Sequence, residues 1–259
     1  MCGFGMRLKR LRWGAQISAF VVSNIGLNWA FKTGCLYPYL YCSGCPLSSG
    51  ACPIGSLQHF ISLPMFPLYI IGLVGLYGLI FGRTLCGWAC PFGAFSDLLS
   101  KPAKVKARAM PQTKFLMLIA IVILAWITSE TFFCKFCPSG SLFAAIPAPF
   151  FYEGLRLGTF YYVHLLTLAI IVMLLLVLPR FWCRYICPYG ITGIFNKISL
   201  ITISHDNSKC NECGNCLNVC PMGINKIHKI GKSTDCILCG RCIDECQARA
   251  LKYSIRFAA

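Results

Sequence analysis

The sequence has few charged residues, and acidic ones are especially scarce. Asp and Glu number only 8 among 259 residues, against 24 Lys and Arg, and charged residues make up 12% of the chain. Hydrophobic residues make up 57%, and the mean hydropathy is +0.66. These values are outside the range of an ordinary soluble domain. The scarcity of charge therefore predicts a membrane protein with a soluble part.

Several signatures of catalysis and binding are also missing. The chain has no P-loop, no dinucleotide-binding glycine pattern and no evident nucleophile–base pair. The formal net charge is +16, but the basic residues gather beside the apolar runs, where they set membrane topology. We therefore expect no nucleic-acid partner. Two isolated histidines, His59 and His164, fit structural roles better than haem ligation.

Four apolar runs are about as long as the ~20 residues that a spanning helix needs. They cover about 13–31, 65–82, 113–129 and 159–178. Basic residues cluster at 7–12, 83–114 and 180–197, whereas the alternate loops carry only Lys32, Lys135 and Arg156. Because positive loops stay inside, we expect a multi-pass protein of the cytoplasmic (inner) membrane with both termini in the cytoplasm.

A cysteine motif ends the second and the fourth apolar run. Cys86-Gly-Trp-Ala-Cys90-Pro91 and Cys183-Arg-Tyr-Ile-Cys187-Pro188 share the pattern Cys-x-x-x-Cys-Pro. Neither pair fills the four sulfur positions of a cubane iron–sulfur cluster, but the two pairs together do. The alternative is a set of buried, inert cysteines. The second copy in a matching context favours one [4Fe–4S] cluster held by all four.

The chain also repeats itself on a larger scale. Cys52-Pro-Ile-Gly-Ser-Leu matches Cys137-Pro-Ser-Gly-Ser-Leu, and each precedes an apolar run that ends in Cys-x-x-x-Cys-Pro. Such parallel repeats relate two halves by an axis along the membrane normal. The repeat predicts that the two Cys-x-x-x-Cys-Pro motifs meet near the inner face, and that the outer loops meet near the opposite face.

The C-terminal segment has the spacing of a bacterial two-cluster ferredoxin, in which the fourth Cys of each run binds the other cluster. One [4Fe–4S] cluster is therefore expected on Cys210, Cys213, Cys216 and Cys246, and another on Cys236, Cys239, Cys242 and Cys220. Zinc and disulfides fit this spacing poorly. Gln247 stands where the pattern has Pro, a departure that removes no ligand.

The outer loops hold further cysteines, whose chemistry the sequence leaves open. A fourth cluster would take four of Cys42, Cys45, Cys52, Cys134 and Cys137. The repeat favours Cys52 and Cys137 as equivalent ligands, joined by Cys134 and by either Cys45 or Cys42. Disulfides are the alternative, because the outer side of the membrane is oxidising.

The combination of apolar segments, twin Cys-x-x-x-Cys-Pro motifs and a two-cluster ferredoxin tail resembles the NapH-type membrane polyferredoxins, with related modules in NosR- and MauN-like proteins. The resemblance covers most of residues 10–255. It implies membrane electron transfer, often from quinol toward a redox partner. It supports Cys86, Cys90, Cys183, Cys187 and the eight tail cysteines as cluster ligands. The outer-loop cysteines depart from the family pattern.

We therefore expect a mainly α membrane protein. Residues 1–203 would form a four-helix transmembrane bundle of two parallel repeats, and residues 204–259 a cytoplasmic α+β ferredoxin domain. The expected function is that of an electron-transfer subunit of an oxidoreductase, linking a quinone pool or membrane partner to other redox subunits or a soluble electron carrier. Three alternatives remain: a transmembrane wire within a larger complex without its own quinone site, a redox sensor or regulator, and an assembly factor for a metallo-oxidase.

Overall fold

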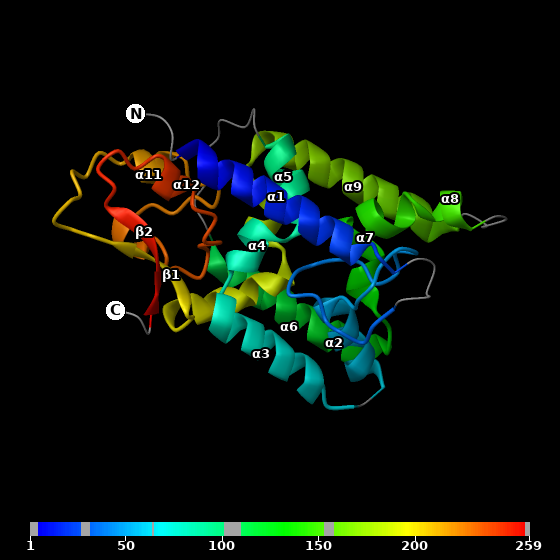
Figure 1. Ribbon diagram of the computed structural model, residues 1–259. Helices are drawn as coiled ribbons and strands as arrows, with labels where there is room; N and C mark the ends of the chain where they lie inside the picture. Colours follow the sequence, from blue (N-terminus) through cyan, green and yellow to red (C-terminus); the bar gives the residue numbers. More distant parts are fainter. Residues whose placement is uncertain (1–4, 27–31, 64, 101–109, 153–157, 257–259) are drawn as a thin grey trace.

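The computed structural model describes residues 5–26, 32–63, 65–100, 110–152 and 158–256. Helices make up most of it, and a small sheet lies at one end (Figure 1). The four longer helices slope in the same direction across Figure 1, with the C-terminal sheet at the end where α1 begins. These helices are α1 (Gly5–Ser23), α3 (Leu68–Phe81), α6 (Pro111–Thr128) and α9 (Thr159–Val177).

The expected spans agree with these helices in three of four cases. The runs at 65–82, 113–129 and 159–178 correspond to α3, α6 and α9. Helix α1 begins at Gly5, so the expected first span from about residue 13 starts within this helix. The basic segment continues the helix, and its Arg12 is buried within 3.8 Å of Asp97. Residues 27–31 of the expected span lie outside the described residues.

Only part of the four-span prediction meets a length and hydropathy test. Within the described residues, α9 is the one helix long and apolar enough to cross a bilayer, with a mean hydropathy of 2.5. Helix α3 and the apolar part of α6 are shorter. At 1.5 Å per residue, the 14 residues of α3 extend about 21 Å, less than the ~30 Å hydrocarbon core. The four-span bundle therefore stays a prediction.

The internal repeat is visible as a repeated order of elements. In each half a long helix is followed by a short Cys-Pro segment, a second long helix, a one-turn helix and a final Cys-Pro segment. Cys52, Cys90, Cys137 and Cys187 each stand directly before the proline that begins a helix, where the missing N–H costs nothing. The shorter elements are α2 (Pro53–Ser62), α4 (Thr84–Trp88) and α5 (Pro91–Leu99) in the first half, then η1 (Phe132–Phe136), α7 (Pro138–Gly140), η2 (Ser141–Ala145), α8 (Ala148–Phe151), α10 (Phe181–Tyr185) and η3 (Pro188–Lys197) in the second.

The C-terminal region is a compact α+β unit. Strand β1 (Ile201–His205) pairs antiparallel with β2 (Leu251–Ile255), with Ile201 opposite Ile255. Between them lie α11 (Asn215–Asn218), η4 (Ile227–Lys229) and α12 (Arg241–Asp244). The predicted boundary at residue 204 would cut β1, so the unit begins nearer Ile201. Its core combines Ile203, Ile224, Ile230, Leu238 and Leu251 with several cysteines.

Candidate iron–sulfur sites

Four outer-loop cysteines, here called the outer quartet, line one cavity between the loop before α2 and the start of α7. They are Cys42, Cys52, Cys134 and Cys137. Burial, together with the nearby Cys52 sulfur, raises the pKa of Cys42 and of Cys134 to about 12. The structure therefore brings together four thiols from the two repeats.

The sequence left open whether Cys42 or Cys45 joins the other three cysteines. In the structure Cys42 lines the cavity and Cys45 does not. Cys45 is buried away from the cavity, with its Sγ 4.0 Å from the Tyr41 hydroxyl and 3.9 Å from Asn24 Oδ1. Cys35 is exposed. Among the described cysteines none forms a disulfide.

The Cys-Pro-x-Gly sequences explain how two of these sulfurs are held. Cys52 and Cys137 occupy the N-cap positions of α2 and α7, so their side chains lie at the starts of these helices. Backbone donors at a helix start favour the thiolate that binds metal. Gln58 is fully buried and adds a neutral donor, with Nε2 3.5 Å from Cys134 Sγ.

The twin Cys-x-x-x-Cys-Pro motifs also converge. This inner quartet consists of Cys86, Cys90, Cys183 and Cys187. Burial raises the pKa of Cys187, and the neighbouring sulfurs of Cys183, Cys86 and Cys90 raise it further, which indicates that all four lie close together. The Gly93 N–H donates to Cys90 Sγ at 3.3 Å, repeating the N-cap arrangement of the outer quartet.

Two buried arginines link the repeats across the inner quartet. Arg83 and Arg180 each lie three residues before the first cysteine of a motif, and they are 1% and 0% exposed. Arg180 Nη1 donates to the Cys86 carbonyl at 3.1 Å, and Arg83 Nη2 donates to the Cys183 carbonyl at 3.4 Å. Each repeat therefore supplies a cation to the motif of the other.

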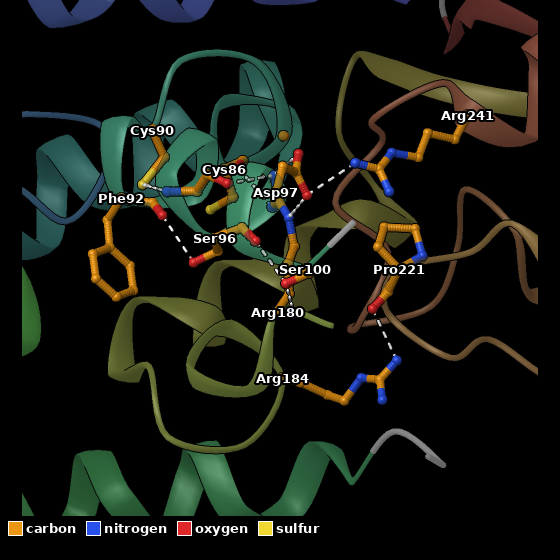
Figure 2. Close-up of polar contacts among 12 residues, drawn as sticks. Cys86, Cys90, Phe92, Ser96, Asp97, Ser100, Arg180, Arg184, Pro221 and Arg241 are labelled. Carbon is orange, nitrogen blue, oxygen red and sulfur yellow. Dashed lines mark hydrogen bonds and ion pairs between the residues drawn. The ribbon is translucent and has the colours of Figure 1, made fainter. Parts of the chain in front are cut away.

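Asp97 on α5 anchors a charged network that includes Arg180 (Figure 2). Its carboxylate pairs bidentately with Arg180 at 2.8 Å and lies 3.1 Å from Arg241 of the ferredoxin domain. Burial favours a raised pKa for Asp97, but Arg180, Arg241 and Arg12 outweigh it and hold the pKa at about 2. The stabilisation from this depressed pKa is therefore fully present above the ordinary value of 3.8 and is lost only as pH falls through about 2.

The tail cysteines line two adjoining cavities. One is lined by Cys220, Cys236, Cys239 and Cys242, and the other by Cys210, Cys213 and Cys246. Cys216 lines both. The fourth cysteine of each run thus stands at the cavity of the other run, as the ferredoxin spacing predicted.

The inner quartet and the ferredoxin domain approach each other closely at Gly87. A Cβ at this position would lie 2.5 Å from the Ile237 carbonyl oxygen and 3.2 Å from Cys239 Cα, so only glycine fits. Arg184, at the equivalent position of the other repeat, donates to the Pro221 carbonyl at 2.8 Å (Figure 2). A second ion pair, Lys114 with Asp235, is also buried between the two domains.

The four thiols of each site are the donor set that a [4Fe–4S] cluster needs. Within the described ranges, no three His, Cys, Asp or Glu side chains are arranged to hold one ion. A cubane spreads its four thiolate ligands around four irons. Among the described residues the buried Arg83 Nε has no hydrogen-bond partner, and an anionic cluster would compensate the charge of its guanidinium.

Sequence reasoning missed the polar residues that join the sites. Asp97 binds three arginines that are distant in the chain, Arg12, Arg180 and Arg241. Arg83 and Arg180 received no site role. The repeated spacing Arg-x-x-Cys-x-x-x-Cys-Pro was a signal that could have found them.

Comparisons with known proteins identify the family. A family model described as "4Fe-4S binding domain" matches residues 62–109, 111–147 and 160–194, and one described as "4Fe-4S dicluster domain" matches 202–247. The ferredoxin-type protein NapH of Haemophilus influenzae is 29% identical over 201 residues, 71% of this chain and 67% of that protein. The chain belongs to the NapH-type polyferredoxin family.

Other relatives extend the likeness. The methylamine utilization ferredoxin-type protein MauN of Methylorubrum extorquens is 30% identical over 57% of this chain and 50% of that protein. An uncharacterized protein of Methanocaldococcus jannaschii is 29% identical over 68% of this chain and 65% of its own length. The chain thus spans about two thirds or less of these relatives. No solved structure matches the chain. As a NapH-type polyferredoxin, it is an iron–sulfur electron-transfer protein.

Proposed function

We propose that this polyferredoxin is a membrane-bound electron-transfer subunit with four [4Fe–4S] clusters in a line. The outer quartet would hold the first cluster and the inner quartet the second. The cavity with Cys239 would hold the third, and the cavity with Cys210 the fourth. Electrons would pass between a quinone pool or membrane partner and other redox subunits. The observation that carries this proposal is the succession of contacts from one site to the next.

Two of these contacts concern the inner end of the line. Gly87 follows Cys86 and packs on Cys239 Cα, which supports a short path from the inner quartet to the third site. Cys216 lines both ferredoxin cavities, which supports a short path from the third site to the fourth. Asp97–Arg241 and Lys114–Asp235 hold the two domains together. Buried pairs of this kind fix geometry even where their net contribution to stability is small.

The exposed side chains of the long helices support a membrane location. Contiguous exposed apolar surface on this scale is rare in soluble monomers. On three helices the exposed large hydrophobic residues would face lipid. They include Leu68, Ile71, Leu76 and Leu79 on α3, Leu116, Ile119, Ile123 and Ile127 on α6, and Leu166, Ile170, Met173 and Val177 on α9.

A groove beside the inner quartet favours a quinone as the membrane substrate. Trp13, Gln16 and Phe20 of α1 line it together with Pro91 and Phe95 of α5. Pro91 follows the cluster ligand Cys90. Gln16 is 2% exposed, and its Nε2 donates to the Gly87 carbonyl. Its buried Oε1 has no partner among the residues that the structure describes. A quinol hydroxyl would donate to this oxygen while its ring and tail lay against the aromatic residues.

The runner-up is a transmembrane wire without a quinone site. The outer quartet favours it, because a quinol oxidase that acts at one face needs no cluster at the other. In that case electrons would enter from a partner at the outer face.

Quinol reduction of the protein in liposomes separates the two. The anaerobic protein should be reduced by added quinol, whereas Gln16→Leu should keep its dithionite-reducible iron and lose most of the quinol-driven rate. The exposed Trp126→Leu change on α6 serves as the control. Equal quinol rates in the wild type and Gln16→Leu would exclude the Gln16 groove as the quinone site, and no reduction by quinol at all would favour the wire.

A further inference from the structure

Two aromatic residues connect the outer quartet with the inner quartet. Phe133 directly precedes Cys134, and Trp182 directly precedes Cys183. Their rings are stacked, with centroids 6.0 Å apart and planes inclined by 29°. The two residues are 6% and 4% exposed. Phe133, which is next to a ligand of the outer quartet, thus contacts Trp182, which is next to a ligand of the inner quartet.

On the outer side, Phe133 is fixed relative to the quartet. Its ring lines the cavity with the four cysteines. The Phe133 N–H donates to Gln58 Oε1 at 3.0 Å, and the same Gln58 side chain donates through Nε2 to Cys134 Sγ. One buried amide therefore holds both the ring-bearing residue and the ligand in place.

On the inner side, Trp182 contacts both motifs of the inner quartet. It is bonded to Cys183 in the second motif, and its ring packs edge-on against Phe92, with centroids 6.5 Å apart. Phe92 belongs to the sequence Cys90-Pro91-Phe92 of the first motif. The Trp182 ring thus lies between the outer quartet and both halves of the inner one.

The indole is not held there by a hydrogen bond. Trp182 Nε1 is buried and has no partner within the described part of the chain. Buried indole N–H groups usually have an acceptor. An apolar side chain such as that of Phe or Leu would therefore fill this pocket at least as well as Trp. The wide π system of Trp is the feature that packing alone does not require.

We propose that Phe133 and Trp182 form the electron-coupling bridge between the outer and inner clusters. The inference rests on the proposed function, because it requires a cluster in each quartet. In each transfer one electron leaves a cluster in one quartet, which is oxidised by one equivalent, and reduces the cluster in the other by one equivalent. No proton moves and no bond forms or breaks. The stacked rings shorten the gap that the electron crosses.

The test measures the rate of electron transfer between the two clusters in the intact chain. One electron is delivered by flash reduction, and freeze-quench EPR follows its equilibration between the outer and inner signals. Trp182→Leu and Phe133→Leu should each slow the exchange by about tenfold or more, a change equivalent to about 1.4 kcal/mol in a rate barrier. Trp182→Phe keeps an aromatic ring, so its exchange rate should lie between the rates of these two variants and that of the wild type.

Controls separate coupling from structure. Iron content and both midpoint potentials should stay at wild-type values in the aromatic variants, and Trp126→Leu should leave the rate unchanged. An unchanged rate in Trp182→Leu with intact clusters would overturn the bridge. If Trp182→Leu loses iron, the exchange rates of Phe133→Leu and Trp182→Phe replace it, and unchanged rates in these two variants would overturn the bridge. A wild-type protein without an outer cluster would overturn the bridge together with the four-cluster proposal, whereas an unchanged exchange rate in the variants would overturn the bridge alone.

Discussion

The outer and inner quartets are built alike but differ in charge. In both, Cys-Pro segments place a cysteine directly before a helix, as at Cys52 and Cys90. The inner quartet lies beside buried Arg83 and Arg180, whereas the side-chain donor at the outer quartet is the neutral Gln58. Hydrogen bonds and net charge around a cluster set its reduction potential. The comparison therefore teaches that one repeated motif can produce two clusters of different potential.

The higher potential is expected at the inner quartet. Nearby cations stabilise the more negative, reduced form of a cluster, and burial strengthens their effect. An electron on the outer cluster would then be drawn inward, toward the ferredoxin domain. The following changes would break or sharpen this difference.

Removal of one quartet ligand should have the largest effect. Cys52→Ala should lower the iron content by about four per chain, because a cubane needs its four ligands. Its matched control is Cys45→Ala, since Cys45 is equally buried but lies outside the quartet. Iron and acid-labile sulfide analysis measures both. Equal iron loss in the two variants would show that the quartet is assigned wrongly.

Loss of the Asp97 charge should strongly lower the free energy of unfolding. Asp97→Asn leaves the fully buried Arg180 without its carboxylate, and breaking a buried pair in this way costs about 3–5 kcal/mol. Denaturant unfolding in detergent measures the free energy. Asp206→Asn, which removes an exposed pair with Lys209, should change it by no more than about 0.5 kcal/mol. Similar values for the two variants would contradict the anchoring role of Asp97.

Neutralising Arg83 should lower the potential of the inner cluster alone. In Arg83→Gln the reduced form loses a buried cation, so the equilibrium constant for reduction should fall about tenfold, or about 59 mV for one electron. Arg83→Lys keeps the charge, so its equilibrium constant for reduction should fall much less. EPR-monitored redox titration measures both clusters in one sample. A shift of equal size in the outer cluster would argue against a local charge effect.

The smallest shift is expected at the outer quartet. Gln58→Leu removes one neutral N–H···S contact, so the outer potential should fall by less than in the Arg83→Gln case. The same titration measures it, with the inner signal as the internal reference. A larger shift than that of Arg83→Gln would reverse the assumed order of the two effects.

The cysteine groups could be predicted because their information is local and repeated. Two motifs with equal spacing and context indicated that Cys86 and Cys183 belong together, and the ferredoxin spacing gave the crossed assignment of Cys220 and Cys246. The choice of Cys42 over Cys45 could not be made, because both lie in one irregular loop. Only the contacts of Cys45 with Tyr41 and Asn24 exclude it from the cavity.

The charged network could not be predicted, because its partners are distant in the chain. Asp97 and Arg180 are separated by 83 residues, and Arg241 belongs to another domain. The same network explains why α1 extends beyond the apolar run into the basic segment. A hydropathy pattern counts Arg12 as a flanking charge, whereas the ion pair with Asp97 allows the helix to bury it.

Iron and acid-labile sulfide per chain test the central claim most directly. The protein would be purified anaerobically in mild detergent and analysed together with its reduced-state EPR spectrum. Four clusters predict about sixteen irons and sixteen sulfides per chain. About twelve would contradict the outer cluster and leave a line of three. About eight would mean that the inner quartet holds no cluster either, and the proposed path across the protein would be wrong.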